Sequence, residues 1–211
     1  MVSEIPGLRI RQANDAEVRP DGEYVLYWMT AFRRTRYNFA LERARNLALE
    51  LNRPLVILEA LRVGYRWASD RMHRFIIEGM RDNAAACSNR SVTYFPYVEK
   101  GRGQGKGLVH ELAAEACVVV TDDYPCFFHP RMIKAVARSM PVPLEAVDSN
   151  CLMPLAYAER TFTVAHSYRR WMQKVLPSHL EDFPEVDPLD ANLTELSSGQ
   201  LDEIQSRWPA A

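Results

Sequence analysis

Two adjacent carboxylates, Asp122 and Asp123, end a short apolar and β-branched run at residues 117–121. Such a run, bounded by turn residues and followed by a helical pattern, predicts a parallel strand buried on both faces of a sheet. The carboxyl ends of parallel strands form the edge at which open α/β sheets bind ligands. The two carboxylates could contact a ligand there, or they could cap the next element and pair with nearby arginines. We favour the structural role, because acids at strand ends are common in this class of fold whatever it binds.

Three arginines, Arg33, Arg34 and Arg36, follow the first predicted strand and are expected at the same edge of the sheet. Guanidinium groups hold anionic ligands through charge-assisted hydrogen bonds. A charged turn in contact with solvent has the same composition. The sequence alone leaves these two interpretations equal.

Alternating glycines at positions 101, 103, 105 and 107 resemble part of a phosphate-binding loop. However, Lys106 is followed by Gly107, where the phosphate-loop pattern requires Ser or Thr. The dinucleotide fingerprint also belongs after the first strand of a sheet and not after the third. We therefore expect a flexible surface loop.

Two other segments are less specific. His129 has no nucleophile or second histidine at a useful spacing, so we expect it to begin a helix. Residues 157–171 mix basic and aromatic side chains that could touch phosphates or pack on a partner domain. We favour packing, because an isolated basic turn gives little affinity at physiological salt.

Composition places the chain among ordinary globular proteins. Its 211 residues are 47% hydrophobic, enough to bury a full core, and its net charge of −1 gives no global attraction for nucleic acid. The four cysteines lie far apart without a C-x-x-C pair, so we expect neither a zinc site nor a disulfide framework, and expect the thiols to be reduced and mostly buried. The polar N-terminus predicts neither a signal peptide nor a membrane span, and we expect a cytoplasmic protein.

Short apolar runs alternate with amphipathic segments along residues 23–150. Because strands separated by helices pair in parallel through right-handed crossovers, the pattern predicts a Rossmann-like, three-layer α/β/α sandwich with a five-stranded parallel sheet. We expect residues 1–22 to form an N-terminal arm and the proline-rich residues 151–211, with one helix at 160–176, to form a linker or tail. The expected strands are 23–30, 54–61, 91–98, 117–122 and 142–147, and the expected helices are 38–51, 70–87, 108–116 and 130–140.

The segment Tyr24-Val-Leu-Tyr-Trp-Met29, followed by Asn38-Phe-Ala-Leu41, resembles the opening of DNA photolyases of the class II type. On this ordered set of motifs, which runs across roughly residues 22–189, the chain is similar to the N-terminal α/β domain of the DNA photolyase/cryptochrome family. Phe39 stands where the family usually has Trp, and the turn at 31–37 differs from the usual Arg-Asp-Gln-Arg-like sequence. The match continues at Asn52-Arg-Pro-Leu55, Val119-Val-Thr-Asp122, Pro141-Val-Pro143, Val147-Asp148 and Leu176-Pro177.

The resemblance implies one domain of a light-dependent DNA-repair lyase. In the family, an antenna chromophore on the α/β domain passes light energy to reduced FAD on a helical domain, and the FAD donates an electron that splits a pyrimidine dimer. These 211 residues contain no counterpart of the helical domain, so we expect no repair by this chain alone, and whether it acts as an enzyme stays open. The implied partner is a helical FAD-binding domain in cis or in trans. DNA binding in isolation is expected to be weak at most, and an apolar face that meets the helical domain in relatives would favour a homodimer.

The resemblance also implies a binding module for a planar antenna chromophore, 8-hydroxy-5-deazaflavin or a flavin, with FAD bound only if a helical domain is supplied. Aromatic and apolar side chains at the strand edge could stack on its rings, and neighbouring polar groups could fix its orientation. The alternative is a nucleotide- or flavin-binding regulatory or scaffold protein with the same Rossmann-like fold. The expected cofactor-binding residues are Met29, Phe32, Arg33, Asn38, Asp122, Asp123, Tyr124 and Phe127, with Phe128 beside them.

Overall fold

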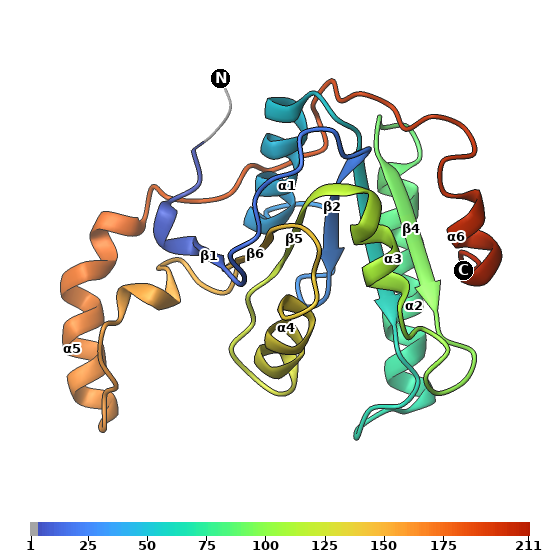
Figure 1. Ribbon diagram of the computed structural model, residues 1–211. Helices are drawn as coiled ribbons and strands as arrows, with labels where there is room; N and C mark the ends of the chain where they lie inside the picture. The colour runs from blue at the N-terminus through green and yellow to red at the C-terminus, as the bar shows by residue number, and fades with distance from the viewer. Residues whose placement is uncertain (1–3) are drawn as a thin grey trace.

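The computed structural model describes residues 4–211 and contains one six-stranded sheet with helices on both faces (Figure 1). The strand order is β1-β6-β5-β2-β3-β4. The five strands from β2 to β6 pair in parallel, and β1 pairs antiparallel with β6. The strands are β1 (Ile10–Gln12), β2 (Tyr24–Met29), β3 (Leu55–Leu61), β4 (Thr93–Val98), β5 (Ala116–Asp122) and β6 (Leu144–Val147).

The predicted three-layer α/β/α fold is confirmed, and each expected strand and helix lies within a few residues of its predicted position. The strand count was wrong by one, because the N-terminal arm adds β1 at the sheet edge. β1 has only three residues, which are half-buried or exposed, so it is too short to show the alternation of apolar and polar residues that predicts a strand. The helices are α1 (Phe39–Leu51), α2 (Asp70–Cys87), α3 (Leu108–Glu115), α4 (His129–Ala137), α5 (Ala165–Val175) and α6 (Asp202–Arg207), with short 3-10 turns η1 (Gly7–Arg9), η2 (Leu155–Tyr157) and η3 (Leu176–His179).

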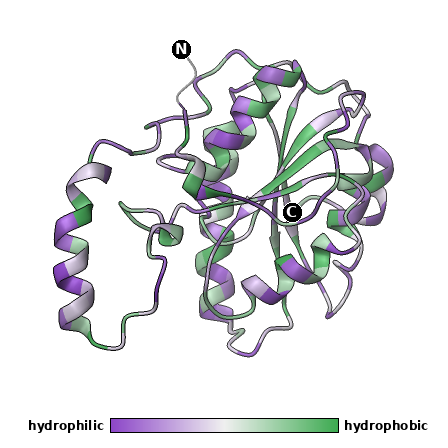
Figure 2. Cartoon of the chain, turned by 60° about the vertical axis from the view of Figure 1, so that its left-hand side comes forward, coloured by the Kyte–Doolittle hydropathy of each residue, from purple (hydrophilic) through white to green (hydrophobic). Residues whose placement is uncertain are grey.

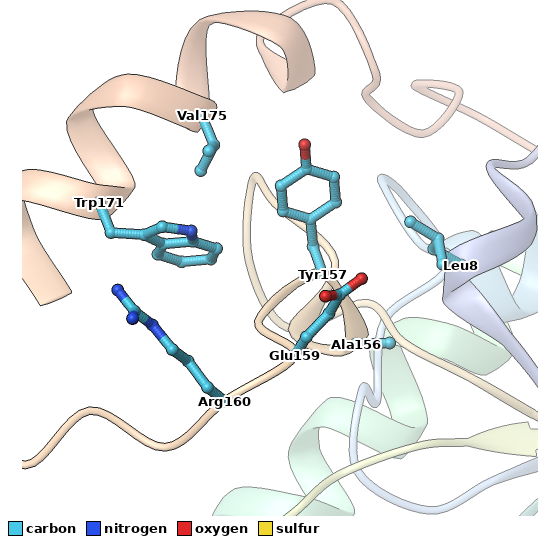
Figure 3. Close-up of a pocket in the computed structure, with 7 residues that line it drawn as sticks. All are labelled: Leu8, Ala156, Tyr157, Glu159, Arg160, Trp171 and Val175. Atoms are coloured by element: carbon cyan, nitrogen blue, oxygen red, sulfur yellow. The ribbon is translucent and has the colours of Figure 1, made fainter.

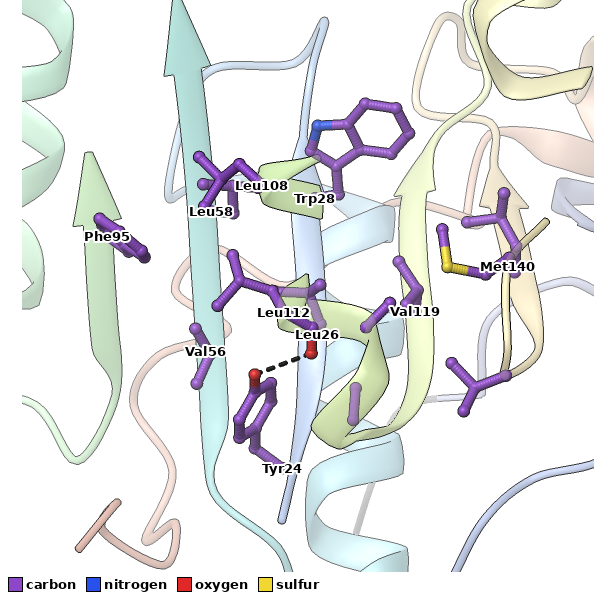
Figure 4. Packing of buried hydrophobic residues seen from close by; sticks show 14 of the residues in the cluster. Tyr24, Leu26, Trp28, Val56, Leu58, Phe95, Leu108, Leu112, Val119 and Met140 are labelled. Carbon is purple, nitrogen blue, oxygen red and sulfur yellow. Dashed lines mark hydrogen bonds between the residues drawn. The ribbon is translucent and has the colours of Figure 1, made fainter. Parts of the chain in front are cut away.

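Alternation along β2 divides the core into two layers, because successive side chains of a strand point to opposite faces. Leu26 and Trp28 belong to the cluster that includes residues of α3, α4 and α6 (Figure 4). Val25, Tyr27 and Met29 belong to the cluster that includes residues of α1. Every residue of β2 is buried, as expected for a central parallel strand covered on both faces.

The N-terminal arm is fastened by a buried arginine. The Arg9 guanidinium donates to the backbone oxygens of Asp148 at 3.2 Å and Leu152 at 2.7 Å, and it lies 4.2 Å from the ring centre of Phe39. Arg9 therefore joins the arm both to the loop after β6 and to the start of α1.

The C-terminal segment divides into a projecting part and a packed part. Helix α5 has no buried residue and stands away from the body of the domain (Figure 2). Residues 184–211 instead return to the α/β domain, where ion pairs join Arg45 to Glu185 at 2.7 Å and Arg90 to Asp187 at 2.9 Å. Five apolar side chains from this return segment enter the two core clusters: Leu189, Leu193, Leu201, Ile204 and Trp208.

Trp208 closes the core layer beside α3. Its side chain is 4% exposed, and its indole Nε1 donates to the backbone oxygen of Gln104 at 2.8 Å. A few residues further on, the backbone N–H of Ala211 donates to the carbonyl of Pro96 on the edge strand β4. The return segment therefore protects one edge of the sheet.

We expect Trp208→Ala to lower the free energy of unfolding by roughly 3–5 kcal/mol, because it removes a buried ring and leaves a cavity. Chemical denaturation measures this loss. Trp67→Ala is the matched control, because Trp67 is 60% exposed and its truncation should cost less than about 1 kcal/mol. Equal stabilities of the two variants would contradict the core assignment of Trp208.

Candidate functional site

The carboxylate of Asp122 holds the turn that follows β2. One oxygen accepts the hydroxyl of Tyr27 at 2.7 Å. The other accepts the backbone N–H groups of Thr30 at 2.8 Å, Ala31 at 2.7 Å and Phe32 at 3.0 Å. Asp122 is fully buried. This carboxylate is therefore occupied by structural hydrogen bonds.

Asn38 extends the same network to α1. Its side-chain oxygen accepts the N–H groups of Ala40 and Leu41, which caps the first turn of the helix. Its amide donates to the hydroxyl of Tyr27 at 3.0 Å and to the carbonyl of Phe32 at 3.1 Å. Burial and the neighbouring Asp122 raise the pKa of Tyr27, so this hydroxyl stays protonated. Asn38 is buried, and both ends of its amide are used.

The other polar residues expected at this edge also have partners within the chain. Asp123 forms an ion pair with Arg11, with two contacts of 2.9 and 3.0 Å. Arg33 donates to the buried Glu59 at 3.0 Å and to the carbonyl of Ala60 at 2.7 Å. The turn after β2 is therefore held mainly by internal contacts.

Met29 lies apart from the exposed edge. It is completely buried in the core layer next to α1, where its sulfur lies 3.9 Å from the side-chain nitrogen of Asn83. The structure does not bring it together with Tyr124 or Phe127.

An aromatic cluster of Phe32, Trp67, Tyr124 and Phe127 gathers at the carboxyl edge of the sheet. Ring centres are 6.1 Å apart for Phe32 and Tyr124, 6.4 Å for Tyr124 and Phe127, and 5.7 Å for Trp67 and Phe127. Three separate loops supply the rings, after β2, β3 and β5. Phe127 is 67% exposed, and its φ of 58° lies in the left-handed region that few non-glycine residues adopt. The cluster is therefore a surface on which a planar ring could stack.

The sequence predicted Phe32, Tyr124 and Phe127 as binding residues at this edge, but the prediction missed Trp67. Trp67 follows β3, a neighbour of β2 in the sheet, and parallel neighbours end at the same edge. An aromatic residue after a predicted strand was the signal that would have found it.

Buried polar atoms without partners lie beside this cluster. Within the described residues, neither the hydroxyl of Tyr65 nor the Nε2 atom of His73 has a hydrogen-bond partner. Their rings lie 5.5 Å apart, and Tyr65 belongs to the same loop as Trp67. Burying such groups unpaired is unfavourable, and both atoms are closed to solvent, so a ligand would reach them only after a local shift.

His129 begins α4, as the sequence predicted, and stacks on Phe128 with ring centres 4.4 Å apart. Burial lowers the pKa of His129, although contacts with the backbone of Thr30 and Cys126 oppose the shift. The imidazole is therefore neutral at pH 7 and does not add a positive charge to the edge.

The glycine-rich loop is organised around Glu99. This carboxylate accepts the backbone N–H groups of Val63 at 3.0 Å, Gly103 at 2.7 Å and Gly105 at 3.2 Å. Burial on its own would raise the pKa of Glu99, but these hydrogen bonds and the nearby Arg62 lower it. Backbone groups that could hold a phosphate thus hold an internal carboxylate, which agrees with the absence of a phosphate-loop motif.

A cavity of about 510 Å³ lies elsewhere, between α5 and the turns η1 and η2 (Figure 3). Tyr157 and Trp171 form two of its walls, with the charged Glu159 and Arg160 between them. It does not adjoin the aromatic cluster, because none of its lining residues comes from the loops after β2, β3 or β5.

Residues 4–211 contain neither a metal-binding cluster nor a membrane-spanning helix. No group of three or more metal-ligating side chains occurs there, and none of the helices in that range combines the length and apolar character needed to cross a bilayer. All four cysteines are free thiols. Cys87 and Cys117 are buried, whereas Cys126 and Cys151 are exposed, so the expectation of mostly buried thiols holds for only half of them.

We expect Asp122→Asn to destabilise the protein by about 1–3 kcal/mol, because the introduced amide places a donor among groups that already donate. Tyr27→Phe, which removes one of the five hydrogen bonds that Asp122 accepts, should cost about 1 kcal/mol. Urea denaturation of both variants tests the ranking. An Asp122→Asn protein as stable as the parent would show that the network does not hold the turn.

Glu99→Gln should also destabilise the fold, by about 1–3 kcal/mol at pH 7, because the amide N–H₂ would face an N–H donor. The folded-state pKa of Glu99 is lowered, so its contribution is present above the unfolded-state pKa and is lost as pH falls through the folded-state value. Denaturation midpoints between about pH 2 and pH 6 should therefore fall less steeply with acid in the variant than in the parent. Parallel pH profiles would contradict this role.

Comparisons with known proteins identify the family of this chain. The family described as DNA photolyase matches residues 25–188. Relatives named deoxyribodipyrimidine photo-lyase include those of Methanothermobacter thermautotrophicus, 33% identical over 71% of this chain and 33% of its own length, and Potorous tridactylus, 25% identical over 82% of this chain and 33% of its own. The Arabidopsis thaliana relative is 26% identical over 87% of this chain and 36% of its own length. The chain thus spans about a third of the length of the curated relatives it matches. Its parallel sheet, the motifs along it and the match over residues 25–188 together show that this chain belongs to the DNA photolyase family, as an N-terminal α/β domain.

Proposed function

We propose that this chain is the antenna-chromophore module of a photolyase-like protein that takes part in light-dependent repair of pyrimidine dimers. The observation that carries the proposal is the aromatic cluster of Phe32, Trp67, Tyr124 and Phe127 at the ligand-binding edge of the sheet. Three loops present these rings around one region, as expected for a site that takes a planar ligand.

The chemistry of this edge fits 8-hydroxy-5-deazaflavin or a flavin. The exposed rings offer stacking surfaces, and the buried, unpaired atoms of Tyr65 and His73 would offer hydrogen bonds to polar ring substituents after a local shift. Such a chromophore supplies light absorption and energy transfer. The contribution of the protein is to bind the ring system, orient it and exclude water from one of its faces.

The sites expected from the sequence divide into two roles in this proposal. Phe32, Tyr124 and Phe127 would contact the chromophore, joined by Trp67. Asp122, Asn38 and Arg33 would act indirectly, by fixing the turn that carries Phe32. Asp123, which pairs with Arg11, and Met29, which is buried in the core, would support the site without contacting the chromophore.

Repair itself is proposed to need the two thirds of the relatives' length that this chain does not cover. A helical FAD-bearing domain, supplied in cis or in trans, is the proposed partner, and FAD as the reactive cofactor would belong to it. The projecting helix α5 supports this arrangement, because Tyr168 and Val164 are left exposed on or next to it. The alternative of a nucleotide-binding regulator has less support, since Glu99 occupies the amides of the glycine-rich loop.

Chromophore retention tests the proposal. After incubation with 8-hydroxy-5-deazaflavin and removal of free ligand, the purified chain should keep a red-shifted visible absorption band. Phe127→Ala should raise the Kd about two- to tenfold through lost stacking. Phe75→Ala is the matched control, because Phe75 is 74% exposed on α2 and forms no ring contact among the described residues. A colourless parent protein, or equal effects of both variants, would refute the site; retention of FAD in place of deazaflavin would identify a flavin antenna.

A further inference from the structure

A cluster of unpaired cations lies next to the aromatic cluster, on the loops after β3 and β4. We call Arg62, Arg66, Lys100, Arg102 and Lys106 the basic patch. All five are exposed, and none forms an ion pair with any residue in the described part of the chain. The chain as a whole is nearly neutral, so this concentration of positive charge is local.

The two loops contain a single acidic residue, which faces inward. Between positions 61 and 69 and between 99 and 107, Glu99 is the only carboxylate. It is 3% exposed and accepts N–H groups from both loops, from Val63 in one and from Gly103 and Gly105 in the other. Its negative charge is used to join the loops, and the outer surface carries the cations.

The loops also touch through Arg102 and Gly64. A Cβ atom at Gly64 would lie 2.7 Å from the Nε atom of Arg102, which is closer than real Cβ contacts. The Arg102 side chain therefore packs against the backbone of the other loop at a position where glycine leaves space for it. The two loops that carry these cations therefore lie side by side, at the lower end of the sheet in Figure 1.

An exposed aromatic ring completes this surface. The guanidinium of Arg66 lies 5.3 Å from the ring centre of Trp67, which is 60% exposed. Grooves that bind single strands combine cations along the phosphate backbone with aromatic rings on which unpaired bases stack. A base-paired duplex offers no free base face to such a ring.

We propose that the basic patch binds the phosphate backbone of single-stranded nucleic acid, with Trp67 at its border stacking on a base. The phosphate contacts do not depend on chromophore binding, because they rest on the arginines and lysines of the two loops. Only the base stacking shares a residue, Trp67, with the proposed chromophore site. It places a nucleic-acid contact on the α/β domain itself, without the part of the relatives that this chain does not cover.

The test is fluorescence anisotropy with a labelled oligothymidine of about 15 nucleotides, titrated with the full chain at several salt concentrations. The patch variant is Arg62→Ala, Arg66→Ala and Arg102→Ala. The control variant, Arg131→Ala, Lys134→Ala and Arg138→Ala, removes the same charge from exposed positions on and next to α4. A second patch variant, Lys100→Gln and Lys106→Gln, covers the case in which the triple variant does not fold.

We expect the parent and the control variant to bind with a Kd that rises with salt. The triple patch variant should bind at least about tenfold more weakly at about 50 mM salt, with its logarithmic salt slope reduced by about 2, because each lost phosphate contact removes about 0.7. The double variant should lower the slope by about 1.4 on the same basis. Absence of binding by the parent, equal losses in the patch and control variants, or tighter binding of duplex than of single strand would overturn the proposal.

Discussion

A single buried carboxylate that accepts five hydrogen bonds sets the geometry on which the candidate site depends. Asp122 ends β5, yet three of its partners are consecutive backbone N–H groups of the turn after β2. Burial of a charge is tolerated only when donors surround it, and here the donors come from the very loop whose path has to be fixed. Because Asn38 links the same turn to the start of α1, the position of Phe32 follows from this one network.

Two other buried carboxylates at or near the carboxyl ends of strands also accept several hydrogen bonds. Glu59, on β3, is buried and receives Arg33 at 3.0 Å, Asn83 at 2.8 Å and Tyr94 at 2.7 Å. Glu99, just after β4, receives three backbone N–H groups. Each carboxylate is used in internal contacts, Glu59 with α2 and β4 as well as with the turn after β2. Exposed aromatic rings, and cations that form no ion pair within residues 4–211, lie on the neighbouring loops. This explains why an edge rich in acids in the sequence carries little negative charge outward.

The sequence was sufficient for the architecture but not for the partners of the polar residues. The central strands are continuous apolar runs and the helices have strong periodicity, so their predicted positions are confirmed. β1 and α6 were not predicted, because a three-residue strand and a six-residue helix are too short to carry a periodic signal. Pairing with β6 holds β1, and the packing of Ile204 and Trp208 holds α6. Residue types at the strand edge indicated Asp122 and Asn38 correctly as edge residues. The structural role favoured for Asp122 and Asp123 agrees with their internal hydrogen bonds and ion pair. Only the fold shows which groups they hold, since this depends on which backbone groups the turn brings within reach.

The central claim is that the aromatic cluster binds a planar chromophore, and a crystal structure of the chain grown with 8-hydroxy-5-deazaflavin tests it most directly. The account predicts the ring system stacked against Phe127 or Trp67, within hydrogen-bond distance of the Tyr65 hydroxyl or His73, and with the Asp122 network unchanged. A chromophore seated elsewhere, for example in the cavity beside α5, or bound only after the turn at residues 30–32 leaves Asp122, would contradict it.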